Sequence, residues 1–229
     1  MSRRFYNNVQ VKSCNGGYQV LLDQRVLKTP NGKPLICPDR AQAACVADEW
    51  RAQGENIDPQ SMPCTRLMNV AIAQTPDRRP DLIKEFVKYA GTDLLCYRVA
   101  HPEELARRQE ESWQKWLDWA EDQHGIALVT TKGIHAIAQP ERSLEQAKAV
   151  AKAFDNVRLT LLLHFTASFG SAILALAVIE QALDVQTGFA LSRLDEIYQN
   201  EHWGVDMEAI DKAGAQLAEL QKLAKLIED

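Results

Sequence analysis

Apolar and polar residues alternate along the first forty residues, which is the pattern of strands with one buried face. The alternating apolar residues are Val9, Val11, Tyr18, Val20 and Leu22. Asn15-Gly16-Gly17 separates the two runs and is typical of a hairpin turn. Further turn-forming residues occupy positions 23–25 and 30–32, and Leu35-Ile36 ends the region. The pattern therefore predicts a small antiparallel sheet.

From Asp39 onward the apolar residues recur every three or four positions, which is the period of an α-helix. Asp39 is suitable as the N-cap of a first helix, which Gly54 would end. Trp50 lies on the apolar face of this helix, and we expect it to be structural, joining the helix to the sheet. Further helices are predicted over residues 65–73 and 80–89, the second beginning at a proline.

Helical periodicity dominates the rest of the chain. Pro102 begins a long helix that Gly125 ends, with an apolar stripe of Trp113, Trp116, Leu117 and Ala120. Residues 126–137 are rich in β-branched side chains and are broken by Gly133, so they predict a small hairpin or an extended loop. The remaining predicted helices cover residues 143–154, 157–181, 185–202 and 206–227.

These elements predict an α+β fold, in which a small β-rich N-terminal domain is followed by a larger all-helical C-terminal domain. The change of period and the prolines Pro76 and Pro80 place the boundary between residues 1–78 and 79–229. Residues 159–179 are almost as apolar as a membrane span, but they contain polar side chains and lack interfacial anchors. We interpret this segment as a central buried helix and expect no membrane insertion.

Charge and the N-terminus narrow the possible partners and compartment. The chain has 26 basic and 31 acidic residues, a formal net charge of −5. Because no basic block is interleaved with aromatic residues, a nucleic-acid partner is not expected. The first residues contain no apolar or arginine-rich leader, which predicts a cytoplasmic protein, or a matrix protein that is already processed.

Catalytic and metal-binding motifs are missing from the sequence. The five cysteines are scattered, odd in number and without a CxxC pair, which predicts reduced thiols and no zinc site. The five histidines have no ligand spacing, and no phosphate-binding, metalloprotease or nucleophile-elbow motif occurs. We therefore predict no metal, no cofactor and no catalytic residues.

Asp93 has two interpretations. It lies between Thr92 and the apolar run at residues 94–97, where it would be either a helix N-cap or a polar partner contact in a cleft. A rival functional hypothesis is a small hydrolase or transferase that uses Asp93, Glu196 and a histidine, although the nucleophile-and-base signature is missing. A third hypothesis is an oligomeric structural protein that uses its last helix as the seam.

Residues 189–204 are the most informative stretch. On a helical wheel one arc is apolar and is expected to face the core; it contains Ala190, Leu191, Leu194, Ile197 and Tyr198. Phe189, Glu196 and Trp203 lie on nearly the opposite side, with Asn200 beside them. Large aromatic side chains outside the buried arc need a second surface to cover them. Either another helix of the same chain or a different protein provides that surface.

Several motifs together resemble one protein family. They are RFY at 4–6, LKTP at 27–30, EW at 49–50, MPCTRL at 62–67, GTDLLCYR at 91–98, WLDWA at 116–120, SRLDEIYQ at 192–199 and WG at 203–204. The chain is similar to the F-type ATPase assembly chaperones that hold the α subunit of the soluble catalytic head before it pairs with the β subunit. The resemblance runs from about residue 4 to residue 204, and the TDLLCYR and ExYQxxxWG patterns are its most specific parts.

The resemblance implies a protein without catalysis or an obligate cofactor, whose partner is the α subunit. It also implies that residues in and near the ExYQxxxWG pattern matter for chaperone action. We expect the partner-binding residues to be Glu196, Trp203, Tyr198, Gln199, Asn200, Phe189 and Asp93, with Trp50 and Gly204 structural. The family is typical of mitochondria and related bacteria, so the missing leader favours a bacterial cytoplasmic member, or a processed protein of the mitochondrial matrix. The chain is expected to act as a monomer.

Overall fold

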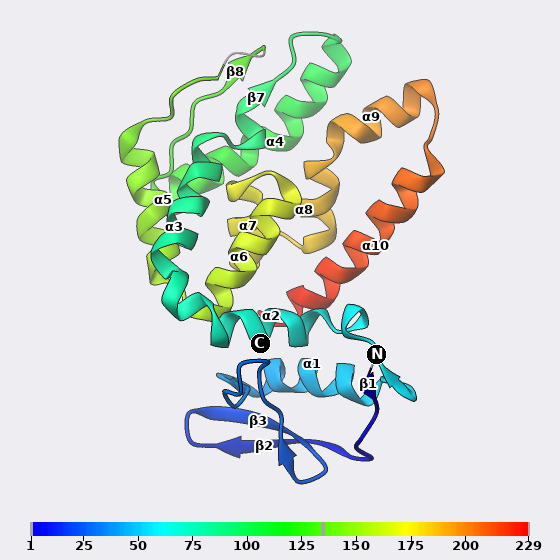
Figure 1. The fold of residues 1–229 in the computed structure, drawn as a ribbon. Coiled ribbons are helices and arrows are strands. Elements are labelled where there is room, and N and C mark those ends of the chain that lie inside the picture. Colours follow the sequence, from blue (N-terminus) through cyan, green and yellow to red (C-terminus); the bar gives the residue numbers. More distant parts are fainter. Residues whose placement is uncertain (1, 134–135, 229) are drawn as a thin grey trace.

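A computed structural model describes residues 2–133 and 136–228 and shows the α+β architecture that the sequence predicts. A small sheet and one helix lie at one end of the molecule, and the remaining helices form a larger body above them (Figure 1). The strands are β1 (Ser2–Arg3), β2 (Val9–Cys14), β3 (Gly17–Leu22), β4 (Arg25–Val26), β5 (Ile36–Cys37), β6 (Asn56–Ile57), β7 (Tyr97–Arg98) and β8 (Thr131–Lys132).

The predicted hairpin is confirmed. β2 and β3 pair antiparallel, and the pairing of Cys14 with Gly17 leaves Asn15 and Gly16 as a two-residue turn. Gly16 has a φ of 91°, a conformation that residues with a Cβ rarely adopt. The other edge of β3 pairs with β4 and then β5, so β3 is the central strand of the small sheet.

The first helix, α1 (Arg40–Arg51), lies against this sheet. Asp39 caps it as expected, because its Oδ1 accepts the backbone N–H of Gln42 at 2.8 Å. Its inner face is built from small and β-branched residues, including Ala43, Val46 and Ala47. The helix ends at Ala52, two residues earlier than the predicted stop at Gly54.

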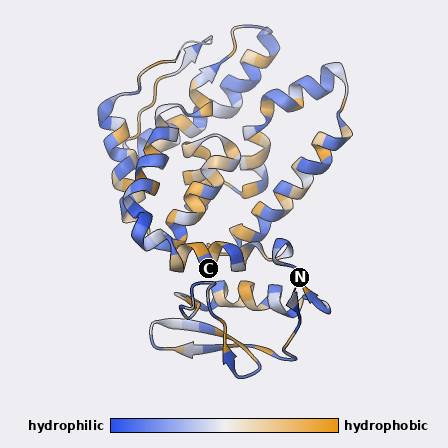
Figure 2. Cartoon of the chain, in the orientation of Figure 1, coloured by the Kyte–Doolittle hydropathy of each residue, from blue (hydrophilic) through white to orange (hydrophobic). Residues whose placement is uncertain are grey.

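The helical body surrounds two central helices, which cover residues 156–169 and 172–179. Its helices are α2 (Pro63–Ala73), α3 (Thr75–Gly91), α4 (Glu103–His124), α5 (Glu141–Ala153), α6 (Asn156–Phe169), α7 (Ala172–Ile179), α8 (Val185–Ser192), α9 (Leu194–Trp203) and α10 (Met207–Ala224). Every residue of α7 is buried, and the other helices are apolar mainly on their inner faces (Figure 2). The interpretation of residues 159–179 as buried is confirmed, and no helix in the described ranges is long and apolar enough to span a membrane.

Two predicted helices are each divided in two. The predicted helix over 157–181 breaks at Gly170, which ends α6 in a left-handed conformation with a φ of 66°. Ser171 then caps α7 by accepting the N–H of Leu174 at 3.0 Å. The predicted helix over 185–202 breaks at Arg193, whose φ of −114° and ψ of 20° separate α8 from α9. Because of this second break, the side chains of α9 point in other directions than one continuous helix would give them.

Other boundaries differ from the sequence prediction. α3 begins at Thr75 and contains Pro80, which was expected to be its first residue. Pro76, in the first turn, is the proline near the helix start. Pro80 lies in the second turn, and because it has no N–H the helix lacks one backbone hydrogen bond there. Within residues 126–133, Thr131–Lys132 form β8, which pairs in parallel with β7 and not with a neighbouring strand of a hairpin. Residues 134–135 of the expected loop lie outside the described ranges.

The domain boundary between residues 78 and 79 stays a prediction. α2 contacts α1 on one side, and α6 and α10 on the other. The two ends of the chain lie near this junction in Figure 1.

Candidate partner-binding surface

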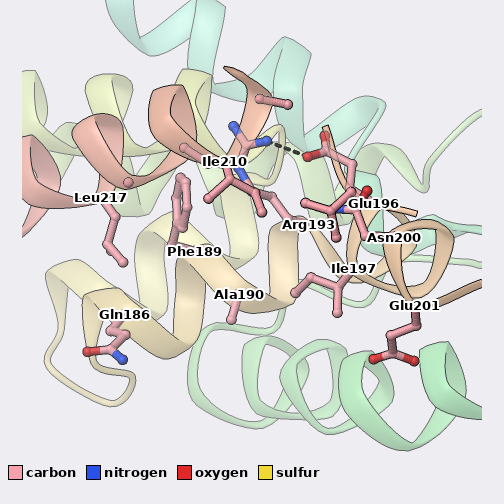
Figure 3. A pocket seen from close by; sticks show the side chains of 14 residues that line it. Gln186, Phe189, Ala190, Arg193, Glu196, Ile197, Asn200, Glu201, Ile210 and Leu217 are labelled. Carbon is pink, nitrogen blue, oxygen red and sulfur yellow. Dashed lines mark hydrogen bonds and ion pairs between the residues drawn. The ribbon is translucent and has the colours of Figure 1, made fainter. Parts of the chain in front are cut away.

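A groove of about 570 Å³ lies between α8 and α9 on one side and α10 on the other (Figure 3). Its walls include small side chains from both sides, and its floor is apolar. The residues that line it are Gln186, Phe189, Ala190, Arg193, Glu196, Ile197, Asn200, Glu201, Val205, Ala209, Ile210, Ala213, Gly214 and Leu217.

The chain reversal after α9 creates the second wall of this groove. Gly204 ends α9 with a φ of 96°, which supports the structural role expected for this glycine. Asp206 then begins α10, because its Oδ1 accepts the N–H groups of Glu208 and Ala209 at 2.9 and 3.4 Å. α10 returns along α8, and its C-terminal half is anchored by the buried Leu220 and Leu223.

Phe189 lies on the floor of the groove and not on the outer face. It is only 6% exposed, and the Arg193 guanidinium lies 4.7 Å from the centre of its ring. The helical-wheel assignment is wrong here, and it is also wrong for Ala190 and Ile197, which were expected to face the core but are exposed. The break at Arg193 is the reason, because the wheel assumed one continuous helix.

Exposed apolar side chains gather in the groove wall and next to it. Of the eight large apolar side chains that are exposed in the described ranges, five belong to residues 197–210. They are Ile197, Trp203, Val205, Met207 and Ile210. Trp203 is 74% exposed and contacts Tyr198 and His202 at one edge, so it is not a core residue. We call these five residues the apolar tip.

The rim of the groove is acidic. Residues 194–211 contain six acidic residues and neither Lys nor Arg. Glu196 forms an ion pair with Arg193, and Glu201 forms one with Arg108 of α4 at 2.6 Å. Asp195 is tied to the body, because its Oδ1 accepts from Nε2 of Gln109 at 2.7 Å. Glu196 and Glu201 therefore each have one cationic neighbour at the surface.

The remaining residues expected in this region have different positions. Tyr198 is 4% exposed and is covered by His202 and the Arg108 guanidinium, with the ring centres of Tyr198 and His202 4.1 Å apart. Its burial agrees with the core arc and indicates that it supports the surface from below. Gln199 is exposed, and Asn200 is half-buried in the groove wall.

Asp93 is not part of this surface. It is fully buried and links the 3₁₀ turn Leu94–Cys96 to the start of α7. Its Oδ1 accepts from the Leu95 N–H at 3.0 Å and the Ser171 hydroxyl at 2.8 Å, and its Oδ2 accepts from the Ile173 N–H at 3.0 Å. Burial raises the pKa of Asp93 to about 6, against the lowering effect of these donors. The N-cap interpretation is confirmed, and the carboxylate has no exposed surface for a partner.

Trp50 lies where the first helix meets the N-terminal segment. Its ring packs edge-on against Tyr6, with ring centres 5.5 Å apart, and the Tyr6 hydroxyl donates to the Trp50 carbonyl at 2.6 Å. The side chain is half-buried against the core. These contacts support the structural role expected for Trp50.

Sequence reasoning missed three residues that shape the groove: Arg193, Glu201 and Ile210. Ile210 lies in the last predicted helix and is 43% exposed. The run of six acidic residues without Lys or Arg was the available signal for the rim, but nothing local indicated the break at Arg193.

The residues of the enzyme hypothesis do not form a common site. Asp93 is buried within the body, whereas Glu196 is exposed on α9, so the two carboxylates do not share a cleft. In residues 2–133 and 136–228, no three His, Cys, Asp or Glu side chains are grouped as metal ligands.

Comparisons with known proteins agree with this description. Residues 3–121 match the family model of the ATP12 chaperone protein. The chain is 26% identical to the mitochondrial protein atp12 of Schizosaccharomyces pombe, over 99% of this chain and 84% of that protein. The crystal structure of Atp12 from Paracoccus denitrificans has a TM-score of 0.93 at 39% identity, covering 99% of this chain and 97% of the other. Atu1473 from Agrobacterium tumefaciens gives a TM-score of 0.94 at 35% identity, over 98% and 85% of the two chains.

An exposed apolar tip at a groove with an acidic rim is typical of a surface that binds another protein. The comparisons make that class specific. The chain belongs to the ATP12 chaperone protein family, and it is a chaperone and not an enzyme. The resemblance to F-type ATPase assembly chaperones seen in the sequence is thereby confirmed.

Proposed function

We propose that this chaperone binds the free α subunit of the F-type ATPase and shields its exposed interface until the β subunit replaces it. The observation that carries the proposal is the concentration of five exposed apolar side chains in residues 197–210, next to a groove. A folded protein rarely exposes such a cluster unless a partner covers it. The expected monomeric state and the cytoplasmic or matrix location stay predictions.

The chemistry of this surface suits a temporary complex. An α subunit alone exposes apolar area that the β subunit later buries, and such area favours aggregation. The apolar tip can cover part of it, while the acidic rim keeps the free chaperone soluble and selects for a complementary client. Because release depends mainly on the off-rate, a contact built around a few anchors can protect the client without blocking assembly.

The test measures the affinity of the chaperone for isolated recombinant α subunit. Trp203→Ala removes the most exposed aromatic side chain, and we expect binding to weaken by about thirtyfold, which corresponds to about 2 kcal/mol. The melting behaviour should hardly change, because a surface substitution of this kind alters stability by about 0.5 kcal/mol or less. Phe5→Ala is the matched control, since Phe5 is 58% exposed but lies in the N-terminal segment.

Glu196→Gln tests the rim separately. Glu196 is 63% exposed and paired with Arg193 three residues earlier, and Glu145 is 63% exposed and paired with Lys148 three residues later. Glu145→Gln therefore removes an equivalent ion pair from a distant helix. We expect Glu196→Gln to weaken binding by about three- to fivefold and Glu145→Gln to have no effect. Parental affinity in both folded variants, Trp203→Ala and Glu196→Gln, would contradict the proposed surface, and no binding by the parent chain would contradict the proposed client.

A further inference from the structure

The groove between α8–α9 and α10 has a shape and charge that indicate what kind of client segment it accepts. Resting on the function proposed above, we propose that it holds an amphipathic α-helical segment of the client, whose apolar stripe is bordered by Lys or Arg residues. The apolar tip and the groove are then two parts of one contact, in which the groove provides the selectivity.

The walls of the groove favour a helix over an extended segment. Both walls are helices, whose backbone groups are already paired within α8, α9 and α10. An added strand would find no exposed sheet edge there to pair with. A helix satisfies its own backbone hydrogen bonds and needs only apolar contact. The groove supplies this contact through Phe189, Ile197, Ile210 and Leu217 (Figure 3).

Small residues leave room for a third helix to approach. Ala190 lines the groove from α8, and Ala209, Ala213 and Gly214 line it from α10. No atom lies within 4 Å of where a Cβ on Gly214 would be, so this part of the wall is open. Helix axes pack about 8–10 Å apart, and the closer distances need small side chains at the contact.

The length of the groove sets the length of the segment. Ile210 and Leu217 both line it and lie seven residues apart on α10, which is about 10 Å along the helix axis. Two turns of a client helix span this distance. They would present apolar side chains at positions i, i+3 or i+4, and i+7.

The charge of the groove indicates which residues flank the apolar stripe of the client segment. Residues 186–217 contain six acidic and two basic residues, and so carry four of the five net negative charges of the chain. Glu196 and Glu201 stand on the groove itself. A client segment flanked by acidic residues would be repelled there, whereas one flanked by Lys or Arg would be attracted.

The experiment identifies the segment by photo-crosslinking. A benzoylphenylalanine placed at the exposed Ala190 reports on the groove, and the same group at Ala215 is the matched control, because Ala215 is exposed on α10 but does not line the groove. After irradiation with isolated α subunit, mass spectrometry maps the attached residues. We expect the Ala190 position to capture one α-helical segment with an apolar i, i+3 or i+4, i+7 stripe and flanking Lys or Arg, which the Ala215 position does not enrich.

Two further measurements complete the test. Ala190→Trp should fill the groove and weaken client binding at least about tenfold, whereas Ala215→Trp should leave it within about twofold. A synthetic peptide of the captured segment should bind the parent chain, and exchange of its Lys and Arg for Glu should abolish that binding. Melting curves establish that each variant is folded.

The outcomes separate this inference from the proposed function. If the α subunit binds normally but the crosslinks lie in an extended or acid-flanked segment, the groove inference is wrong and the function stands. Crosslinks only to a second copy of the chaperone would also refute it, and would assign the groove to self-association. If the parent chain does not bind the α subunit at all, the proposed function fails first.

Discussion

Asp93 gives the structure its most direct test by pH. The fully buried carboxylate accepts hydrogen bonds from Leu95, Ser171 and Ile173, and it joins two elements whose sequence positions are about eighty residues apart. The perturbation is Asp93→Asn, which keeps the size of the side chain but removes its titration. One of the two oxygens becomes an NH₂ group.

Part of the effect of Asp93→Asn on the free energy of unfolding does not depend on pH. With the amide oxygen in the place of Oδ1, the NH₂ group faces the N–H of Ile173, and two donors then oppose each other. Leaving a buried donor without an acceptor costs about 1–3 kcal/mol.

A second part of the effect on stability depends on pH, and the raised pKa of Asp93 sets its sign. In the folded chain the pKa of Asp93 is about 6, above the ordinary 3.8, so the folded state holds its proton more strongly than the unfolded state. The contribution of Asp93 to stability is therefore full at low pH and falls as the pH rises from about 4 to about 7. A shift of about two pKa units corresponds to about 3 kcal/mol over this interval.

Urea denaturation of the parent and of Asp93→Asn, repeated between about pH 4 and about pH 7.5, measures the difference directly. Because position 93 does not titrate in the variant, all other titrating groups cancel to first order. The advantage of the parent over the variant should shrink as the pH rises. An advantage that is constant with pH, or that grows, would refute the reasoning, because it would show that the hydrogen-bond donors outweigh the cost of burial.

Two other predictions concern stability and organisation. Trp50→Arg should lower the free energy of unfolding by about 3–5 kcal/mol, because it puts an unpaired charge against Tyr6 and the core, and thermal melts will show it. A variant that melts like the parent but fails to bind the client would make Trp50 a contact residue. The predicted boundary between residues 78 and 79 should give limited-proteolysis cuts in residues 56–63 or 75–80, and cuts confined to the interiors of the other helices would count against it.

Much of the fold could be predicted where local chemistry decides the outcome. Asn15 and Gly16 match a two-residue hairpin turn, and Asp39 and Gly125 are local caps, so the elements beside them were predicted correctly. The break between α6 and α7 also had a local signal, since Gly170 followed by Ser171 combines a left-handed C-cap with an N-cap. The largely apolar character of residues 159–179 outweighed that signal.

The candidate surface could be predicted only in part. Its acidic and aromatic character is visible in the sequence, and Trp203 is exposed as the partner-binding interpretation requires. The placement of Phe189 and Ile197 could not be predicted, because Ser192 and Arg193 carry no strong helix-stop signal. Next to the break the Trp113 indole N–H donates to the Leu191 carbonyl at 3.0 Å, a contact between distant parts of the chain that periodicity does not report.

Arg193 connects this break to the behaviour of the surface. Its guanidinium stacks over Phe189, donates to Gln216 of α10 at 2.8 Å and pairs with Glu196, so one side chain holds α8, α9 and α10 around the groove. A planar guanidinium can stack and donate at the same time, which a lysine cannot do. The same pairing limits client affinity: a basic client residue must compete with Arg193 for Glu196, and with Arg108 for Glu201. The binding free energy that the client gains at each carboxylate is then only the difference between two similar ion pairs. In the proposed complex, a rim built in this way selects for basic flanks while it keeps the affinity low enough for the β subunit to displace the chaperone.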